Sequence, residues 1–199
     1  FFALVMLHFG TRFMAVEMGY EPSYQYWKLG LVVNLFICFV TNGFSIFLTP
    51  GGFDIKMNHG MMLGKYRRGI MMRERGFLVF WGFFSLVLYT LLIKILLPVQ
   101  VASEAIMVAY AIALWSLFPY DIFARIYIKD APISHGASLF FARPAAFGVF
   151  TVLFLVFSGL FTYILDWFWP AVAALLVGYA GYLVFYTLYD KNPARRMYR

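Results

Sequence analysis

Long apolar runs separated by short polar stretches dominate the pattern of this chain. Six runs approach the roughly 20 residues that a helix needs to cross a bilayer. They cover residues 1–16, 29–48, 77–97, 101–127, 144–166 and 167–188. The first run is short, and the fourth contains Pro119, which kinks or ends a helix because it lacks a backbone donor. We therefore predict an all-α integral membrane protein with about six transmembrane helices.

The sixth run also contains a small-residue face. In the stretch VGYAGY, Gly178, Ala180 and Gly181 allow a neighbouring helix to approach closely. We predict a helix–helix contact at this point.

Composition supports the membrane class. Of the 199 residues, 63% are hydrophobic, 22% are aromatic and 13% are charged. A soluble domain carries about 25% charged residues. The apolar runs leave little room for a separate soluble domain, so we expect a single domain.

The basic residues, which give a net charge of +7, gather between the runs. If the runs alternate in direction, all the basic regions lie on one side, which the positive-inside rule makes cytoplasmic. We predict a protein of the plasma membrane, with residues 191–199 as a basic cytoplasmic tail and no nucleic acid as partner. The loop after the second run also suits anionic lipid head groups. The residues that suit this contact are Lys65, Arg67, Arg68, Arg73 and Arg75, and Lys56 adds to the positive charge of the same loop.

The chain begins without methionine, inside an apolar run. We expect that it is processed, or that its true start and an upstream helix precede Phe1. The single cysteine, Cys38, has no internal partner for a disulfide.

Four stretches occur in an order and at a spacing that resemble the site-2 protease family of intramembrane zinc metalloproteases. They are HFGTRFMAVEMGY, NGFSIFLTPGGF, RERGFLVFWGFFSLVL and ALWSLFPYDIFARIY, which begin at residues 8, 42, 73 and 113. The first resembles the family's H-E-x-x-H helix, and the third keeps the family's glycine spacing through Gly76 and Gly82. The resemblance implies a site-2 protease-like core over residues 1–130, with a membrane-dipping or interfacial loop around 49–72. Residues 131–190 then form an additional transmembrane hairpin.

Two of the positions that carry the family's chemistry hold other residue types in this chain. The resemblance implies a zinc held by two histidines and an aspartate, with a glutamate that takes a proton from the zinc-bound water. His8 keeps the first histidine position, but Phe9 replaces the glutamate and Arg12 replaces the second histidine. Phenylalanine transfers no proton, and a guanidinium has no lone pair for a metal. Asp121, at the third-ligand position, follows Pro119 too closely, so we expect no zinc, no catalytic residue and no cleavage.

Arg12 lies four residues after His8 and therefore on the same face of a helix. A cation at membrane depth is costly unless it is paired or reaches water. We predict that Asp121 pairs with Arg12 across the former metal site. The alternative is that Arg12 extends to the interface and His8 bonds to the backbone or to water.

A second candidate site is the stretch KMNHGMML. Met57, His59, Met61 and Met62 carry thioether and imidazole groups that suit copper, especially Cu(I). Methionine also packs irregular interfaces, and this role is the favoured interpretation of the loop.

These observations predict a catalytically inactive site-2 protease-like subunit. It would act as a scaffold or accessory subunit of a larger membrane complex, with other transmembrane subunits and anionic lipids as partners. One alternative is an active zinc metalloprotease, whose metal would sit at His8 with ligands from elsewhere. Another is a copper-associated accessory subunit that uses the Met/His loop.

Overall fold

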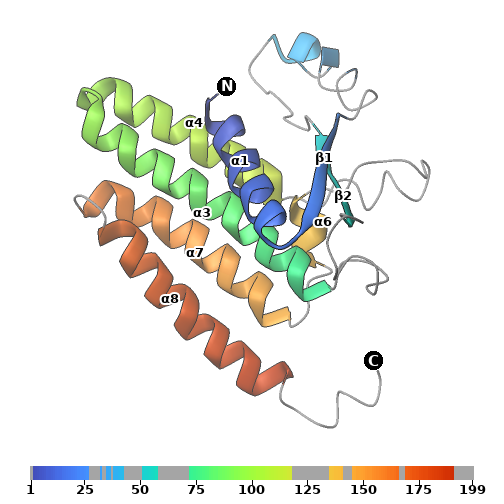
Figure 1. Ribbon diagram of the computed structural model, residues 1–199. Coiled ribbons are helices and arrows are strands. Elements are labelled where there is room, and N and C mark those ends of the chain that lie inside the picture. Colours follow the sequence, from blue (N-terminus) through green and yellow to red (C-terminus); the bar gives the residue numbers. More distant parts are fainter. Residues whose placement is uncertain are drawn as a thin grey trace.

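The computed structural model describes residues 2–26, 32, 35–36, 38–42, 51–57, 72–117, 135–140, 145–165 and 169–190. The chain is mostly helical (Figure 1). Its elements are α1 (Phe2–Glu17), β1 (Tyr20–Tyr26), β2 (Gly51–Met57), α3 (Met72–Leu96), α4 (Val99–Leu117), α6 (His135–Phe140), α7 (Ala145–Ile164) and α8 (Trp169–Phe185), which continues as a π-helical turn, Tyr186–Asp190.

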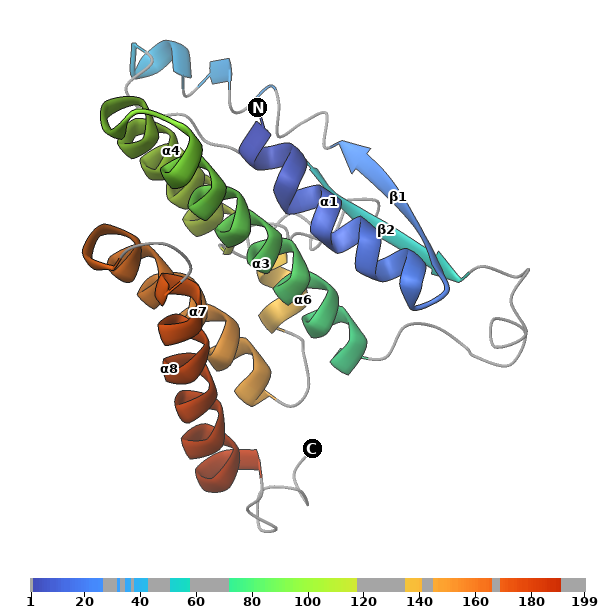
Figure 2. The same ribbon diagram turned by 60° about the vertical axis from the view of Figure 1, so that its left-hand side comes forward.

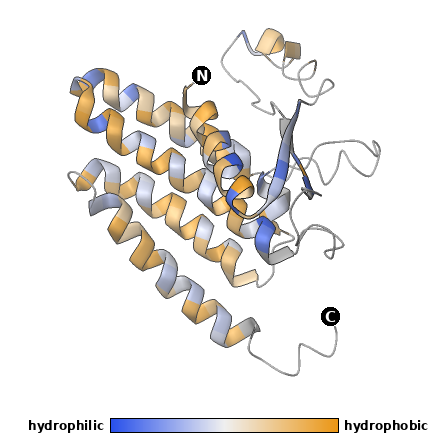
Figure 3. Cartoon of the chain, in the orientation of Figure 1, coloured by the Kyte–Doolittle hydropathy of each residue, from blue (hydrophilic) through white to orange (hydrophobic). Residues whose placement is uncertain are grey.

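Within the described residues, four helices are long and apolar enough to cross a membrane. Their spans are Glu74–Leu96, Val99–Leu117, Ala145–Ile164 and Trp169–Leu188. Apolar residues dominate these helices, whereas the strand pair carries more polar ones (Figure 3). The prediction of a helical membrane protein is thus confirmed for four of the six runs. The predicted run 29–48 falls largely outside the described residues, and α1, with 16 residues, is shorter than the four spans.

The strands are an addition that the all-α prediction lacked. β1 and β2 pair antiparallel, from Tyr20 opposite Met57 to Tyr26 opposite Gly51. Their signal in the sequence is the alternation of Tyr20, Tyr24 and Tyr26 with polar residues, which is the period of a strand. The interfacial stretch predicted around 49–72 therefore contains a strand at Gly51–Met57.

α3 is the central helix of the molecule. It lies between α1 and α7, with α4 folded back beside it (Figures 1 and 2). In the apolar span of α3, 61% is buried inside the protein. The corresponding shares are 28% for α4, 33% for α7 and 17% for α8. Leu78, Phe83, Leu86 and Val87 are almost completely buried, although they point to different sides of the helix. A helix that is apolar all round is suited to this position.

α1 packs antiparallel to α3 at very close range. A Cβ built on Gly10 would lie 2.5 Å from the Trp81 carbonyl oxygen, and one on Gly82 would lie 2.9 Å from the Leu7 carbonyl oxygen. Ser85 Oγ donates a hydrogen bond to the Met6 carbonyl oxygen at 2.5 Å, which a wider separation would break. The two glycines thus let two backbones approach as small residues do in membrane helix pairs.

α8 returns alongside α7 and confirms the predicted small-residue contact. A Cβ on Gly178 would lie 3.0 Å from the Phe150 ring, and Gly181 faces Leu153. Ala180 is exposed and takes no part in the contact. α7 and α8 thus lie side by side in the second part of the chain (Figure 1), and the predicted additional transmembrane hairpin over residues 131–190 stays a prediction.

Lys94, near the end of α3, reaches the end of α7. Its Nζ donates hydrogen bonds to the carbonyl oxygens of Thr162 at 2.6 Å and Leu165 at 2.7 Å. The last carbonyl groups of a helix have no intrahelical partner and favour a nearby cation. This contact fastens the end of α7 to the central helix.

We predict that Gly82→Ala destabilises the protein. The added methyl group would force the α1 and α3 backbones apart, at a cost on the order of 1–3 kcal/mol. Gly148→Ala is the matched control, because its Cβ would meet the Leu139 carbonyl oxygen at an ordinary 3.5 Å. Thermal unfolding in detergent measures both variants. Equal stability of the two would contradict the proposed close contact.

Candidate functional site

A cluster of ring and hydroxyl groups surrounds His8. The ring centroid of His8 lies 4.9 Å from that of Tyr24 and 5.5 Å from that of His135. Thr11 Oγ1 lies 3.3 Å from His135 Nε2, and the Phe83 ring centroid lies 5.9 Å from that of His135. The cluster thus joins α1, β1, α3 and α6.

The turn after α1 positions Tyr24. Gly19 has a φ of 81°, a left-handed conformation that glycine adopts without strain. The chain then enters β1, where Tyr20 is buried and its hydroxyl donates a hydrogen bond to Glu74 Oε2 at the start of α3. Tyr24 lies on the same face of the strand as Tyr20, because side chains alternate along a strand. It therefore points toward α1 and contacts His8.

His135 begins the short helix α6, which packs against α3, α4 and α7. Burial, together with a smaller effect of the neighbouring His8, lowers the pKa of the His135 imidazole to about 3. The ring is therefore neutral at physiological pH. In the strand region, burial raises the pKa of the Tyr24 hydroxyl, so that group stays protonated.

The hydrogen bonds of Thr11 indicate the tautomer of His135. Thr11 Oγ1 donates to the Leu7 carbonyl oxygen at 3.2 Å, so toward His135 it serves as an acceptor. His135 Nε2 then carries the hydrogen and donates to Thr11. Because a neutral imidazole holds one hydrogen, Nδ1 of His135 carries the lone pair.

The two replaced motif positions lie on the outer face of α1. The Phe9 side chain is 58% exposed, and Arg12 is also exposed. Asp121 lies outside the described residues, so the predicted Arg12–Asp121 pair stays a prediction. Among the described residues, no carboxylate forms an ion pair with Arg12.

The predicted soft-metal and lipid sites fall mostly outside the described residues. Met57 ends β2, whereas His59, Met61, Met62, Lys65, Arg67 and Arg68 have no described position. Arg73 and Arg75 lie in the first turn of α3. The structure therefore places these two residues in the sequence of the central helix, near its first end.

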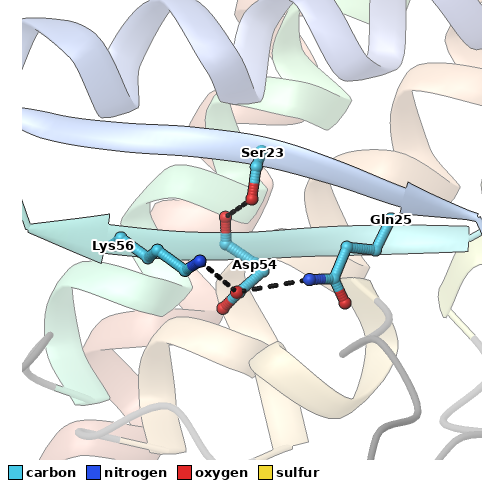
Figure 4. A network of polar contacts seen from close by, with 4 residues as sticks. All are labelled: Ser23, Gln25, Asp54 and Lys56. Atoms are coloured by element: carbon cyan, nitrogen blue, oxygen red, sulfur yellow. Dashed lines mark hydrogen bonds and ion pairs between the residues drawn. The ribbon is translucent and has the colours of Figure 1, made fainter.

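The strand pair carries an exposed polar network (Figure 4). Ser23 Oγ donates to the Asp54 carbonyl oxygen at 3.1 Å, and Gln25 Nε2 donates to Asp54 Oδ2 at 3.3 Å. Lys56 Nζ lies 3.8 Å from the same carboxylate oxygen. These groups satisfy one another across the strands, which suits a sheet in contact with water.

Nothing in the sequence alone associates His135 with His8. The two residues are far apart in the sequence, and His135 lies within the predicted loop between the fourth and fifth runs, so no helical or strand spacing links them. In the described part of the chain, no group of three or more His, Cys, Asp or Glu residues is placed to hold a metal ion. The two histidines can therefore supply two ligands at most from that part.

Comparisons of this chain with known proteins identify no relative. No family model, no curated protein and no solved structure matches this chain. The resemblance to site-2 proteases therefore depends on the four sequence stretches alone.

We predict that acid destabilises the fold through His135. Its pKa in the folded state lies below the ordinary 6.5, so below that pH the unfolded chain binds more protons. The contribution of neutral His135 to the free energy of unfolding is fully present above about pH 6.5. This contribution is lost as the pH falls toward the folded-state pKa. Between pH 7 and pH 5 the unfolding temperature of the wild type should fall more steeply than that of His135→Phe. This variant keeps an aromatic ring beside Phe83. His59→Ala controls for removal of a histidine elsewhere, and equal slopes in all three proteins would exclude this role.

Proposed function

We propose that this chain is a catalytically inactive, site-2 protease-like membrane subunit that holds other transmembrane helices. The observation that carries the proposal is the placement of Phe9 and Arg12. Both stand where the resembled motif has its proton-transferring and metal-binding groups, and both are exposed on the outer face of α1. Neither side chain can supply the chemistry of that position.

The extent of exposed apolar surface supports a role in a complex. α8 buries 17% of its span and α4 buries 28%, so most of each helix is available to lipid or to another subunit. Helices in a bilayer associate through close packing and polar contacts between their faces. A chain with a well-packed central helix and open outer helices suits a scaffold.

The charged end of α3 supports the proposed orientation. Arg73 and Arg75 lie there, at the same end as Glu74 and the strand pair that contacts it. Under the positive-inside rule this end faces the cytoplasm, where anionic lipid head groups are available.

We expect the gently solubilised native protein to co-purify with other transmembrane subunits. We also expect it to cleave no transmembrane substrate, because no glutamate follows His8. Mass spectrometry of the purified material and peptide-release assays measure the two outcomes, with His8→Ala as the control for contaminating proteases. Isolation of the chain alone, or cleavage that disappears in His8→Ala, would contradict the proposal.

A second candidate function is supported by the pair of histidines. With a Zn–N distance of about 2.1 Å and about 1.1 Å more to the ring centre, two imidazoles in a tetrahedral site have ring centres about 5.2 Å apart. The 5.5 Å between His8 and His135 is close to this value. His135 would then be the ligand from elsewhere that a zinc metalloprotease of this sequence requires.

Metal analysis separates the two candidates. For the inactive subunit we expect far less than one zinc per chain, because the described residues supply too few ligands for a closed site. One zinc per chain that is lost in both His8→Ala and His135→Ala would favour the second candidate. His59→Ala is the control, and a loss of copper in that variant would indicate the Met/His loop instead.

A further inference from the structure

The strand pair fixes both ends of the chain segment that connects its two strands. β1 ends at Tyr26, β2 begins at Gly51, and these two residues are partners in the antiparallel sheet. Partners on neighbouring antiparallel strands have Cα atoms about 4.5–5.5 Å apart. Residues 27–50 therefore leave the sheet and return to it at one place.

This constraint conflicts with a single crossing of the membrane by the predicted run 29–48. A helix of that length is about 30 Å long. The short connections at residues 27–28 and 49–50 reach only about 20 Å together, even when fully extended. They cannot bring the two ends of such a helix back to paired strands.

The flanking helices lead to the same conclusion. Tyr20, just after α1, donates a hydrogen bond to Glu74 at the start of α3. The chain thus leaves α1 and enters α3 at the same end of the bundle, and β1 runs back along α1 between them (Figures 1 and 2). One crossing between α1 and α3 would place these two helix ends on opposite sides.

The described residues of the segment show where its apolar run is interrupted. Residues 32, 35–36 and 38–40 are helical. Asn42 has a φ of 49°, and its backbone nitrogen donates a hydrogen bond to the Phe39 carbonyl oxygen at 3.3 Å. An asparagine in this left-handed conformation ends helices. The apolar stretch before the turn, residues 29–40, has a length of about 12 residues, which is typical of interfacial, re-entrant or core helices.

The exposure of its side chains excludes the role of a core helix. Five large apolar residues are spaced three or four apart, so they share one face of the helix. Their exposed fractions lie between 64% and 84%. They are Val32, Leu35, Phe36, Phe39 and Val40. This face therefore needs a cover from outside the described fold.

Lipid is the cover that fits this face. The protein carries four candidate membrane spans, so a bilayer lies beside it. Ser23 and Gln25 on β1 are polar and exposed, which indicates that the segment starts and ends near water. A helix that is tethered near water and exposes an apolar face is suited to the plane of the membrane surface. In the sequence it follows Trp27 and Lys28, residue types that favour that surface.

We infer that the helix at residues 32–40 is an interfacial anchor. It lies in the surface layer of the bilayer, with lipid acyl chains against its exposed face, and run 29–48 does not cross the membrane. The chain then has one crossing fewer than the six apolar runs predict. This inference concerns a contact with lipid and does not depend on the proposed function.

Spin labels on single cysteines in the full chain test this inference. Cys38, the only cysteine, is first replaced by serine. Labels at Phe36→Cys and Phe39→Cys, in phosphatidylcholine vesicles, then report contact with oxygen, which dissolves in lipid, and with a nickel chelate, which stays in water. Tyr179→Cys is the deep control, because Tyr179 is 56% exposed near the middle of the α8 span. Ser23→Cys is the control for water.

We expect both anchor labels to contact lipid and to lie roughly 5–10 Å shallower than the label at position 179. Phe39 is close to the midpoint of run 29–48, so a crossing helix would place its label as deep as the Tyr179→Cys control, and this result would overturn the inference. Contact with the nickel chelate equal to that of Ser23→Cys would also overturn it. A label that neither reagent reaches would mean that a second copy or another part of the chain covers the face.

A disulfide cross-link tests the constraint itself. In the Cys38→Ser chain, Tyr26→Cys combined with Gly51→Cys should form a disulfide on oxidation, because the two positions are partners in the sheet. Tyr26→Cys combined with Asp54→Cys is the matched control and should form none, since Asp54 is the partner of Ser23. Thermal unfolding verifies that each variant is folded. A folded first variant without the disulfide would overturn the inference.

Discussion

α1 and α3 approach each other where Gly10 and Gly82 present no side chains between the two backbones. Much of the described structure follows from this contact. It sets the level of Thr11 against α3 and thereby the height of its bond to His135. It also sets the level at which Arg12 leaves the opposite side of α1. The inner and outer features of α1 therefore share one geometric origin, which is the absence of two Cβ atoms.

The helices of the membrane domain could be predicted from the sequence because the length of an apolar run is a strong constraint. The predicted run 144–166 corresponds closely to α7, and the glycines at 178 and 181 contact that helix as their spacing indicated. The strands were harder to predict. Seven residues such as YEPSYQY carry a weak alternation, and their pairing with Gly51–Met57 depends on a partner far away in sequence.

In the candidate site, too, some residues could be predicted from the sequence and others could not. His8 and Arg12 stand out in the sequence as polar residues within an apolar run, and their spacing predicts that they share one face of a helix. His135 and Tyr24 could not be associated with His8 in this way, because a contact between elements depends on how whole helices and strands pack. Local spacing predicts which residues share a face of an element, but it does not predict what covers that face.

The central position of α3 has a consequence for how the protein tolerates change. Leu78, Phe83 and Leu86 are almost completely buried on different sides of this helix, so a difference in size at any of them must be absorbed by several neighbours at once. The outer face of α8 meets no other described helix, and there many apolar residues can replace one another without a change in packing. Sequence drift in this protein is therefore expected to be uneven, with the central helix held nearly fixed in side-chain volume and the outer helix fixed mainly in polarity.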